Sequence, residues 1–561
     1  MSAVRSGWVS RVRGPRVVRP VWQVAAVLIA LAALVPAASL AWIAMAADGS
    51  HWEHLVQHVL PAAMGNTAVL LAGVGMVVTV VGTACAWVVT AYDFPGRRTL
   101  TWALLLPLAM PTYIVAFVYL DMLHPIGPFQ GLVRSLLGYD SPREFRLPDL
   151  RAMWGAVFVM GSVLYPYVYL TMRALFMSQP RQLLEAARTL GEGRWGAFLR
   201  VAWPLGRPAL AVGLSLALLE TLNDIGASEF LGVNTLTVAI YSTWVTRSDL
   251  AAAAQIACAM LFVVVVLMVL EAHGRRQQRF GTPRQMDGIR AVPLTGLTAW
   301  VVTAAVSLPV VLGFVAPAGY LLIDVTQRLA SGQQLTVGLL NSLGNSLGLA
   351  AGVSIVVLGA GLVVAWADRR ISTNSVAPGW MVRAASVGYA VPGSVLAIGI
   401  LAPALFLDRA WAQAIGVPGL PLMGSGVILV VACVFRFMAM SAGGIAAGLT
   451  RIPVQIEQSS RSLGETAWGT LRRVHLPLLK PSLAAATLLV FVDAMKELPL
   501  TLLLRPVNFE TLSTVLYGEA ARGAYEEGAL AALAIVLAGL LPVIWLARTQ
   551  LHSHRFRKSP T

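Results

Sequence analysis

Long apolar segments alternate with short polar segments along the whole chain. A membrane-spanning helix needs about 20 predominantly apolar residues, and twelve segments meet this requirement. They are 22–47, 64–91, 99–120, 152–176, 206–223 and 250–271, followed by 297–323, 341–367, 381–407, 423–448, 482–504 and 528–547. The pattern predicts an all-α polytopic membrane protein with about twelve transmembrane helices.

The basic residues are concentrated in every second connection between these segments. The basic connections are the N-terminal tail, Arg97–Arg98, 184–210, 272–296, Arg369–Arg370, 457–483 and the C-terminal tail. Lys and Arg collect in the cytoplasmic loops of membrane proteins. We therefore expect a multi-pass protein of the bacterial inner (plasma) membrane with both termini cytoplasmic. The connection 121–150, in which acidic and basic residues nearly balance, is assigned to the outside.

Composition narrows the class of protein further. Hydrophobic residues make up 57% of the 561 residues and charged residues only 12%, with a net charge of +15. Because the basic residues flank membrane spans, we expect the lipid bilayer as a partner and no nucleic acid. The three cysteines lie singly inside apolar segments, so neither a disulfide framework nor a metal site is predicted.

The chain also contains an internal repeat. Residues 184–210 and 457–483 are identical at 12 of 27 positions at a constant offset of 273. At an offset of 279, the sequence around Gly65–Asn66 matches that around Gly344–Asn345. We infer two parallel six-helix repeats. The predicted domains are a first half at 1–271, a cytoplasmic linker at 272–296, a second half at 297–547 and a basic tail at 548–561.

The two repeated loops carry a motif. Glu185-Ala186-Ala187 is followed at fixed spacing by Gly191, Val201 and Trp203-Pro204; the second loop has Gln458-Ser459-Ser460, Gly464, Val474 and Leu476-Pro477. This spacing resembles the EAA motif of ABC-importer permeases, in a type I importer-like fold. We expect a short helix that breaks at the glycine, with the proline restarting the chain into the next span. Two departures are Trp203 in place of Leu and Gln458-Ser459-Ser460 in place of the acidic triplet.

The resemblance implies that each loop docks one copy of a cytoplasmic ABC ATPase. The docking residues would be Glu185, Ala186, Gly191, Pro204, Gln458, Gly464 and Pro477. The chain has no Gly-x4-Gly-Lys-Ser/Thr motif, so ATP and Mg would be bound by the partner. We therefore expect no cofactor in this chain, no catalytic residues and no enzymatic activity.

Polar residues recur where a span of each half ends. Glu220, Asn223 and Asp224 in the first half correspond to Asp493, Lys496 and Glu497 in the second. The spacing of four predicts that the two carboxylates of each half share a helix face. Ionisable groups at membrane depth cost about 2.5–3.5 kcal/mol and usually face a cavity or a partner.

Two interpretations of these six residues remain open. They line the translocation path or its gate, or they hold the halves together or lie at the outer mouth. Lys496 can pair with either Asp493 or Glu497. Arg436, inside the tenth span, can extend to the membrane surface or pair with an acidic residue.

The run Met495–Pro506, MKELPLTLLLRP, resembles the fused ferric-iron permeases of the ABC importers. The family implies a periplasmic ferric-iron-binding protein as donor and transport by alternating access. No metal ligand is assigned. One alternative is the same architecture importing thiamine, an aminophosphonate or a polyamine. The other is a secondary transporter driven by an ion gradient.

Overall fold

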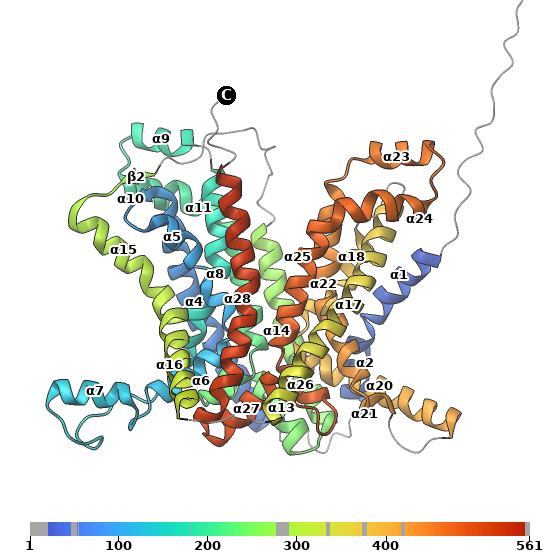
Figure 1. Cartoon of the computed structure of the whole chain (residues 1–561), viewed down its shortest axis with the longest axis horizontal. Coiled ribbons are helices and arrows are strands. Elements are labelled where there is room, and N and C mark those ends of the chain that lie inside the picture. The colour runs from blue at the N-terminus through green and yellow to red at the C-terminus, as the bar shows by residue number, and fades with distance from the viewer. Residues whose placement is uncertain are drawn as a thin grey trace, which may run out of the picture.

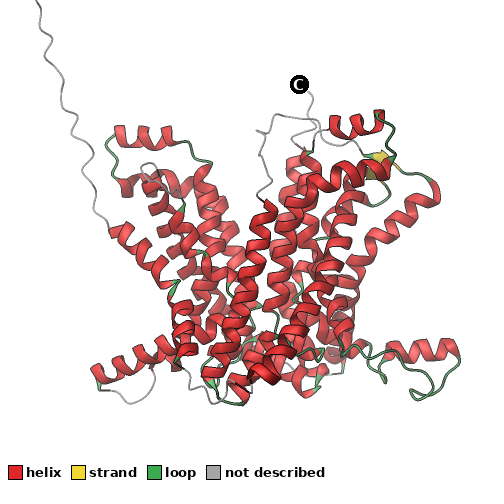
Figure 2. Cartoon of the chain, turned by 180° about the vertical axis from the view of Figure 1, so that it is seen from behind, coloured by secondary structure: helices red, strands yellow, loops and turns green. Residues whose placement is uncertain are grey.

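A computed structural model describes residues 21–46, 53, 55–179, 181–275, 291–331, 337–372, 379–416 and 421–555. The described residues form helices joined by short loops (Figures 1 and 2). Eleven helices are long and apolar enough to cross a membrane, and a bent helix pair brings the number to twelve. The prediction of an all-α polytopic protein with about twelve spans is confirmed.

The six spans of the first half are built as follows. They are α1 and α2 (Val21–Ala32, Val35–Met45), η2 and α4 (Leu55–Val59, Leu60–Ala91), a bent third span, α8 (Met153–Ser178), η4 and α11 (Phe198–Ala202, Trp203–Asn223), and α14 (Leu250–Arg275).

The second half follows the same order. Its spans are α15, η6 and α16 (Gly296–Val310, Val311–Val315, Ala316–Ala330), α17 (Val337–Ser372), α20 (Gly393–Ile415), α22 (Val427–Thr450), α24, η7 and α25 (Ala467–Thr470, Leu471–His475, Leu476–Met495), and α28 (Tyr525–Arg555). Of the predicted linker, residues 276–290 lie outside the described residues, as do 556–561 of the predicted tail.

The third span of each half is not the single helix that the sequence predicted. Segment 99–120 divides into α5 (Arg97–Ala103), η3 (Leu106–Ala109) and α6 (Thr112–Met122). The chain bends by 90° between the part that ends with η3 and α6. In the second half, α18 (Trp380–Ala385) and α19 (Val387–Ala390) precede α20. Pro111 and Pro392 are extended, with ψ of 143° and 146°, directly before α6 and α20. Proline lacks the N–H that a continuous helix needs.

The fifth span of each half ends at the polar residues, as predicted in the first half and earlier than predicted in the second. α11 ends at Asn223 and is followed by α12 (Gly226–Phe230); α25 ends at Met495, not at 504, and is followed by α26 (Pro499–Leu504). The prediction that the paired carboxylates share a helix face is therefore wrong, because the helix ends between them. Asp224 and Glu497 instead accept hydrogen bonds from the N–H groups of Ala227 and Leu500, at 2.9 and 3.1 Å. A carboxylate that caps the next short helix satisfies N–H groups that have no partner within that helix.

The first span of each half packs against the other half. α1 and α2 contact α17, α18 and α20, whereas α15 and α16 contact α4, α5 and α6. Trp22 of α1 stacks on Trp468, with ring centroids 5.8 Å apart. Strands β1 (Tyr92–Asp93) and β2 (Val292–Pro293) pair in parallel where the halves meet. The two sequence repeats are therefore interlocked.

Small residues allow close packing inside each half. A side chain at Gly82 of α4 would lie 2.8 Å from Val168 of α8, and one at Gly361 of α17 would lie 2.2 Å from Ser441 of α22. These glycines correspond at the offset of 279. Close backbone approach at small residues is the usual way in which helices associate in lipid.

The repeated loops and the helix breaks lie at opposite ends of the molecule. Helices α9 (Arg181–Thr189), α10 (Arg194–Ala197) and α23 (Val454–Ser462) lie at one end, and α7 (Pro128–Leu137), α13 (Leu236–Tyr241) and α27 (Leu512–Arg522) lie at the other (Figure 1). The long helices spread apart toward the end that carries α9 and α23, as both views show (Figures 1 and 2).

Candidate translocation site

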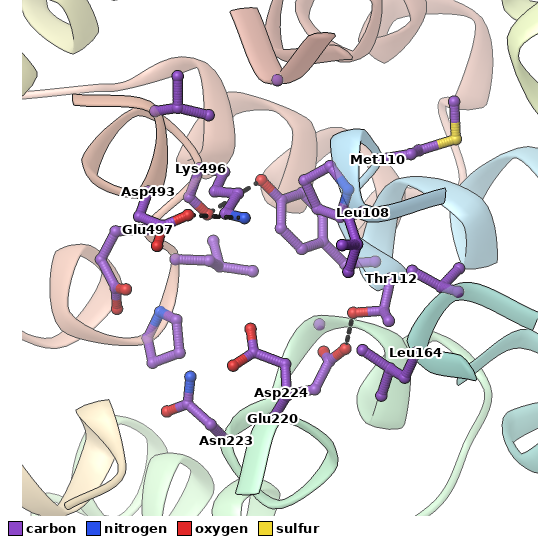
Figure 3. A pocket seen from close by; sticks show the side chains of 18 of the residues that line it. Leu108, Met110, Thr112, Leu164, Glu220, Asn223, Asp224, Asp493, Lys496 and Glu497 are labelled. Atoms are coloured by element: carbon purple, nitrogen blue, oxygen red, sulfur yellow. Dashed lines mark hydrogen bonds and ion pairs between the residues drawn. The ribbon is translucent and has the colours of Figure 1, made fainter. Parts of the chain in front are cut away.

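A cavity of about 330 Å³ lies where the helix breaks of the two halves meet. Glu220, Asn223 and Asp224 line it from the first half, and Asp493, Lys496 and Glu497 line it from the second. Figure 3 shows Glu220 and Asp224 across the cavity from Asp493 and Lys496. The structure thus brings together all six polar residues singled out from the repeat.

The two carboxylates of the first half differ in how they are held. Asp224 accepts a hydrogen bond from the Thr112 hydroxyl (Figure 3). It also accepts one from the Ala227 N–H, so its position is fixed. Glu220 lies one turn earlier on α11 and forms no hydrogen bond or ion pair with the described residues. It is therefore available to a group that enters the cavity.

The second half supplies the cations as well as the acids. The Lys496 ammonium lies 2.8 Å from Asp493, and Arg436 of α22 lies 3.0 Å from Glu497. The open pairings of Lys496 and Arg436 are thereby settled, since each cation takes a different carboxylate. Both Arg436 and Glu497 are buried, and a buried charge requires such a partner.

Among the described residues, three hydrogen bonds cross between the halves beside the cavity. The Asn223 side-chain oxygen accepts from the Gly393 N–H at 2.8 Å and from Arg436 at 3.2 Å. The Tyr113 hydroxyl donates to the Lys496 carbonyl at 3.3 Å. The two interpretations of the polar residues are consequently compatible, because residues that line the cavity also hold the halves together.

Several lining residues were missed by sequence reasoning. Thr112 and Tyr113 begin α6, and Tyr167 and Tyr389 come from α8 and α19. The match of Pro111 with Pro392 is the signal that could have found Thr112 and Tyr113, because a proline at matched positions marks a shared helix break. Tyr167 gave no such signal, because the residue at the matching position of the second half is Met440 and is therefore not identical. Met440 also lines the cavity.

The cavity lining is acidic overall and partly apolar. Four carboxylates face two cations, Arg436 and Lys496, which leaves a formal charge of −2 when all are ionised. Among the described residues, no group of three or more His, Cys, Asp or Glu side chains could hold a metal ion. The arrangement suits transient contact with a passing cation better than tight ligation.

The two repeated loops have the same backbone geometry. Gly191 and Gly464 follow α9 and α23 with φ of +89° and +86°, values that favour glycine. Beyond each glycine, matched ion pairs join Glu192 to Arg200 and Glu465 to Arg473. Leu190 and Leu463, directly before the glycines, are 85% and 86% exposed.

The sequence predicted that the prolines of the motif restart the chain after a break. In the structure they do not. Pro204 and Pro477 lie in the first turns of α11 and α25, and π-helices η4 and η7 precede them without interruption. The only break in each loop within the described residues is at the glycine. A proline in the first turn of a helix loses no intrahelical bond.

Glu457, directly before the predicted docking residue Gln458, forms ion pairs within the chain. Glu457 pairs with Arg461 at 2.6 Å and with Arg369 of α17 at 3.4 Å. Arg369 also donates to the Ile452 carbonyl at 2.9 Å. Gln458 is exposed, as are Glu185 and Ala186 in the first loop. The acidic residue that precedes the second motif by one position therefore faces its own chain.

Comparison with known proteins identifies the family. The sequence model of the binding-protein-dependent transport system inner membrane component matches residues 78–279 and 358–553. An Fe(3+)-transport system permease protein of Haemophilus influenzae is 23% identical over 86% of this chain and 89% of its own length. The sulfate transport system permease of Escherichia coli is 28% identical over 45% of this chain and 88% of its own length.

A third relative, named for 2-aminoethylphosphonate transport in Salmonella choleraesuis, is 28% identical over 33% of this chain and 64% of its own length. The double match to the family model agrees with the internal repeat, and the helices agree with a multi-pass protein. The chain therefore belongs to the family of inner membrane components of binding-protein-dependent transport systems, as a non-catalytic permease subunit of an ABC importer that works with a separate ATPase and a solute-binding protein.

Proposed function

We propose that this permease imports ferric iron by alternating access. The observation that carries the proposal is the acidic cavity at the matched helix breaks of the two halves. A periplasmic ferric-iron-binding protein would deliver the iron to this chain. The lipid bilayer would surround the spans as a further partner. The six polar residues would then line the translocation path and its gate.

The charge of the cavity supports a cationic cargo. A sulfate or an aminophosphonate would meet a lining with more carboxylates than cations, and like charges in a medium of low dielectric constant repel strongly. Fe(III) is a hard cation that prefers oxygen ligands, and carboxylate and tyrosine oxygens line this cavity. The Fe(3+)-transport relative also covers both halves, whereas the sulfate relative covers less than half of the chain.

Within this proposal the lining residues have different roles. Glu220 has no fixed partner and would contact the cargo directly. Asp224 and Glu497 would hold the helix breaks in shape through their bonds to Ala227 and Leu500. Asn223 and Tyr113 would act as a gate, because their bonds between the halves must break when the halves separate.

The repeated loops would couple this movement to ATP. Each loop would bind one ATPase copy through its exposed motif residues, with Leu190 and Leu463 entering apolar recesses of the partner. ATP and Mg would remain in the ATPase, and this chain would need no cofactor. The end that carries α9 and α23 would face the cytoplasm, together with both termini.

The proposal predicts that neutralising Glu220 slows iron uptake. Glu220→Gln keeps the size of the side chain and removes the charge, so the rate of ATP-dependent uptake into proteoliposomes should fall severalfold. Asp224→Asn should also slow uptake, because it removes a negative charge from the cavity lining, whereas its amide oxygen can still accept from Ala227 and hold the helix break. The matched control is Ser215→Ala on the same helix, whose hydroxyl donates to the Ala211 carbonyl of its own helix.

Full-rate iron uptake by a Glu220→Gln/Asp224→Asn double variant would contradict the role of these residues. If the complex transports thiamine or a polyamine and not iron, the acidic path is retained in the proposal, but ferric iron is wrong as the cargo. Uptake that continues after ATP depletion, with the proton gradient intact, would favour a secondary transporter.

A further inference from the structure

Helix α7 has its polar and apolar sides reversed relative to a helix of a soluble protein. Gln130 is only 2% exposed; it donates to the Leu123 carbonyl at 2.6 Å and accepts from the Leu147 N–H at 3.2 Å. Arg134, also buried, donates to the Pro125 carbonyl at 2.8 Å. On the opposite face, Leu132 and Leu136 are exposed, Leu136 by 77%.

The end of α20 shows the same reversal. Asp408 is fully buried and accepts hydrogen bonds from the N–H groups of Leu422 and Met423, at 2.8 and 2.9 Å. Leu407 and Trp411, one turn apart, are each 55% exposed. The polar side chain thus faces the protein's own loop, and the apolar side chains face outward.

These two segments occupy equivalent places in the two halves. Each follows the proline break of the third span, α7 after Pro111 and the end of α20 after Pro392. Figures 1 and 2 show them projecting sideways from opposite flanks of the bundle, both at the end away from α9 and α23. We call them the lateral helices: α7 (Pro128–Leu137) and the residues 405–415 of α20.

Water does not account for this arrangement. Exposed apolar surface in water is unfavourable by about 25 cal/mol per Å², and the same reversal has been built twice. A bilayer does account for it, because an interfacial helix buries its apolar face among acyl chains and aromatic residues such as Trp favour that boundary. On the side of α7, α16 packs on α6, the helix that precedes α7 in the chain, and exposes the apolar residues Leu322 and Ile323.

We infer that the lateral helices lie in the lipid headgroup boundary of one leaflet and bury their exposed apolar faces in it. The leaflet is the one away from the α9 and α23 loops. Two anchors on opposite flanks would fix the depth and tilt of the helix breaks that surround the cavity. The inference concerns the bilayer alone and does not depend on the identity of the cargo.

Spin labelling of the full-length protein in lipid nanodiscs tests the inference. Labels would be attached to Leu136→Cys and Trp411→Cys, with Ser135→Cys and Gln413→Cys as matched controls on other faces of the same helices. The native Cys85, Cys258 and Cys433 would be replaced by Ala. The measurement compares collisions of each label with oxygen, which concentrates in lipid, and with a water-soluble nickel complex.

We expect the labels at 136 and 411 to have an oxygen-to-nickel accessibility ratio severalfold above that of the controls. Equal ratios at all four positions would place the lateral helices in water and overturn the inference. The inference would also be overturned if the labels at 136 and 411 became inaccessible to both oxygen and the nickel complex only when a solute-binding protein is added. The exposed faces would then be a docking site for that protein.

A second measurement leaves the native cysteines in place. Brominated lipids quench tryptophans at the acyl boundary, so the native protein should lose more fluorescence on bromination than the Trp411→Phe variant. The same fractional quenching in both proteins would also overturn the inference for α20.

Discussion

At the scale of the residue, the buried pair of Arg436 and Glu497 is a strong constraint on the site. The guanidinium lies 3.0 Å from the carboxylate, and both side chains are almost completely removed from solvent. Removing one partner of such a pair typically costs about 3–5 kcal/mol, because the other charge remains buried and uncompensated. An exposed pair contributes much less, about 0–1 kcal/mol.

We therefore predict that Glu497→Gln lowers the thermal transition of the purified protein by several degrees. Combining it with Arg436→Met should restore most of the loss, since no unpaired charge is left. Arg522→Gln, which removes the exposed partner of Glu519, is the matched control and should have little effect. A Glu497→Gln variant as stable as the native protein would show that the pair is not a structural constraint.

The sequence identified most of the charged residues of the site but not their pairing. The offset of 273 matched Glu220 with Asp493 and Asp224 with Glu497 without any structure. Arg436 has Val163 at the corresponding position, so no repeat pointed to its role. Its choice of Glu497 depends on how α22 packs beside the α25–α26 break, which is a tertiary property.

At the scale of the element, breaks rather than continuous helices define this protein. The spans were predictable because apolar length is a strong signal. The end of the fifth span in the second half was not predictable, because the capping carboxylate Glu497 competes with helix continuation in a way that composition does not reveal. Likewise, Pro111 and Pro392 break the helices of segments 99–120 and 381–407, although both segments are apolar enough to be predicted as continuous spans.

The break in each repeated loop leads to a second prediction. A left-handed conformation costs a residue with a Cβ atom about 1–2 kcal/mol, and nothing lies within 4 Å of the added atom at Gly464. Gly464→Ala should therefore weaken ATPase co-purification through backbone strain alone. Gly464→Asn should weaken it less, because Asn tolerates this conformation better.

Gly193→Ala is the control for the first loop, where Gly191→Ala is the corresponding test. Gly193 has no positive φ and open space around it. If Gly191→Ala and Gly464→Ala retain the ATPase as fully as Gly193→Ala does, the glycine break is not part of the docking geometry.

At the scale of the whole molecule, the two halves are sequence repeats but not separate packing units. α1 and α2 lie against the second half, and α15 and α16 lie against the first. Tyr119 reaches the Leu312 carbonyl at 2.7 Å, and Tyr320 reaches Asp121 at 2.9 Å. This exchange of first spans could not be predicted from the repeat, since the offset relates equivalent residues and does not indicate contacts between them.

We predict that either half expressed alone, with the chain divided inside segment 276–290, does not give a stable monodisperse protein. The two halves expressed together should assemble, because the exchanged spans then find their partners. Fluorescence-detected size-exclusion chromatography distinguishes these outcomes. A monodisperse first half on its own would contradict the interlocked arrangement.

The proposed role of this chain is to form the translocation path of an ATP-driven ferric-iron importer. Its most direct test is the accumulation of radioactive Fe(III) in proteoliposomes that hold the chain with its ATPase and its solute-binding protein. We expect accumulation that requires ATP and the binding protein together and that slows severalfold with Glu220→Gln. Binding-protein-stimulated ATP hydrolysis that moves another solute, with no accumulation of iron, would contradict it.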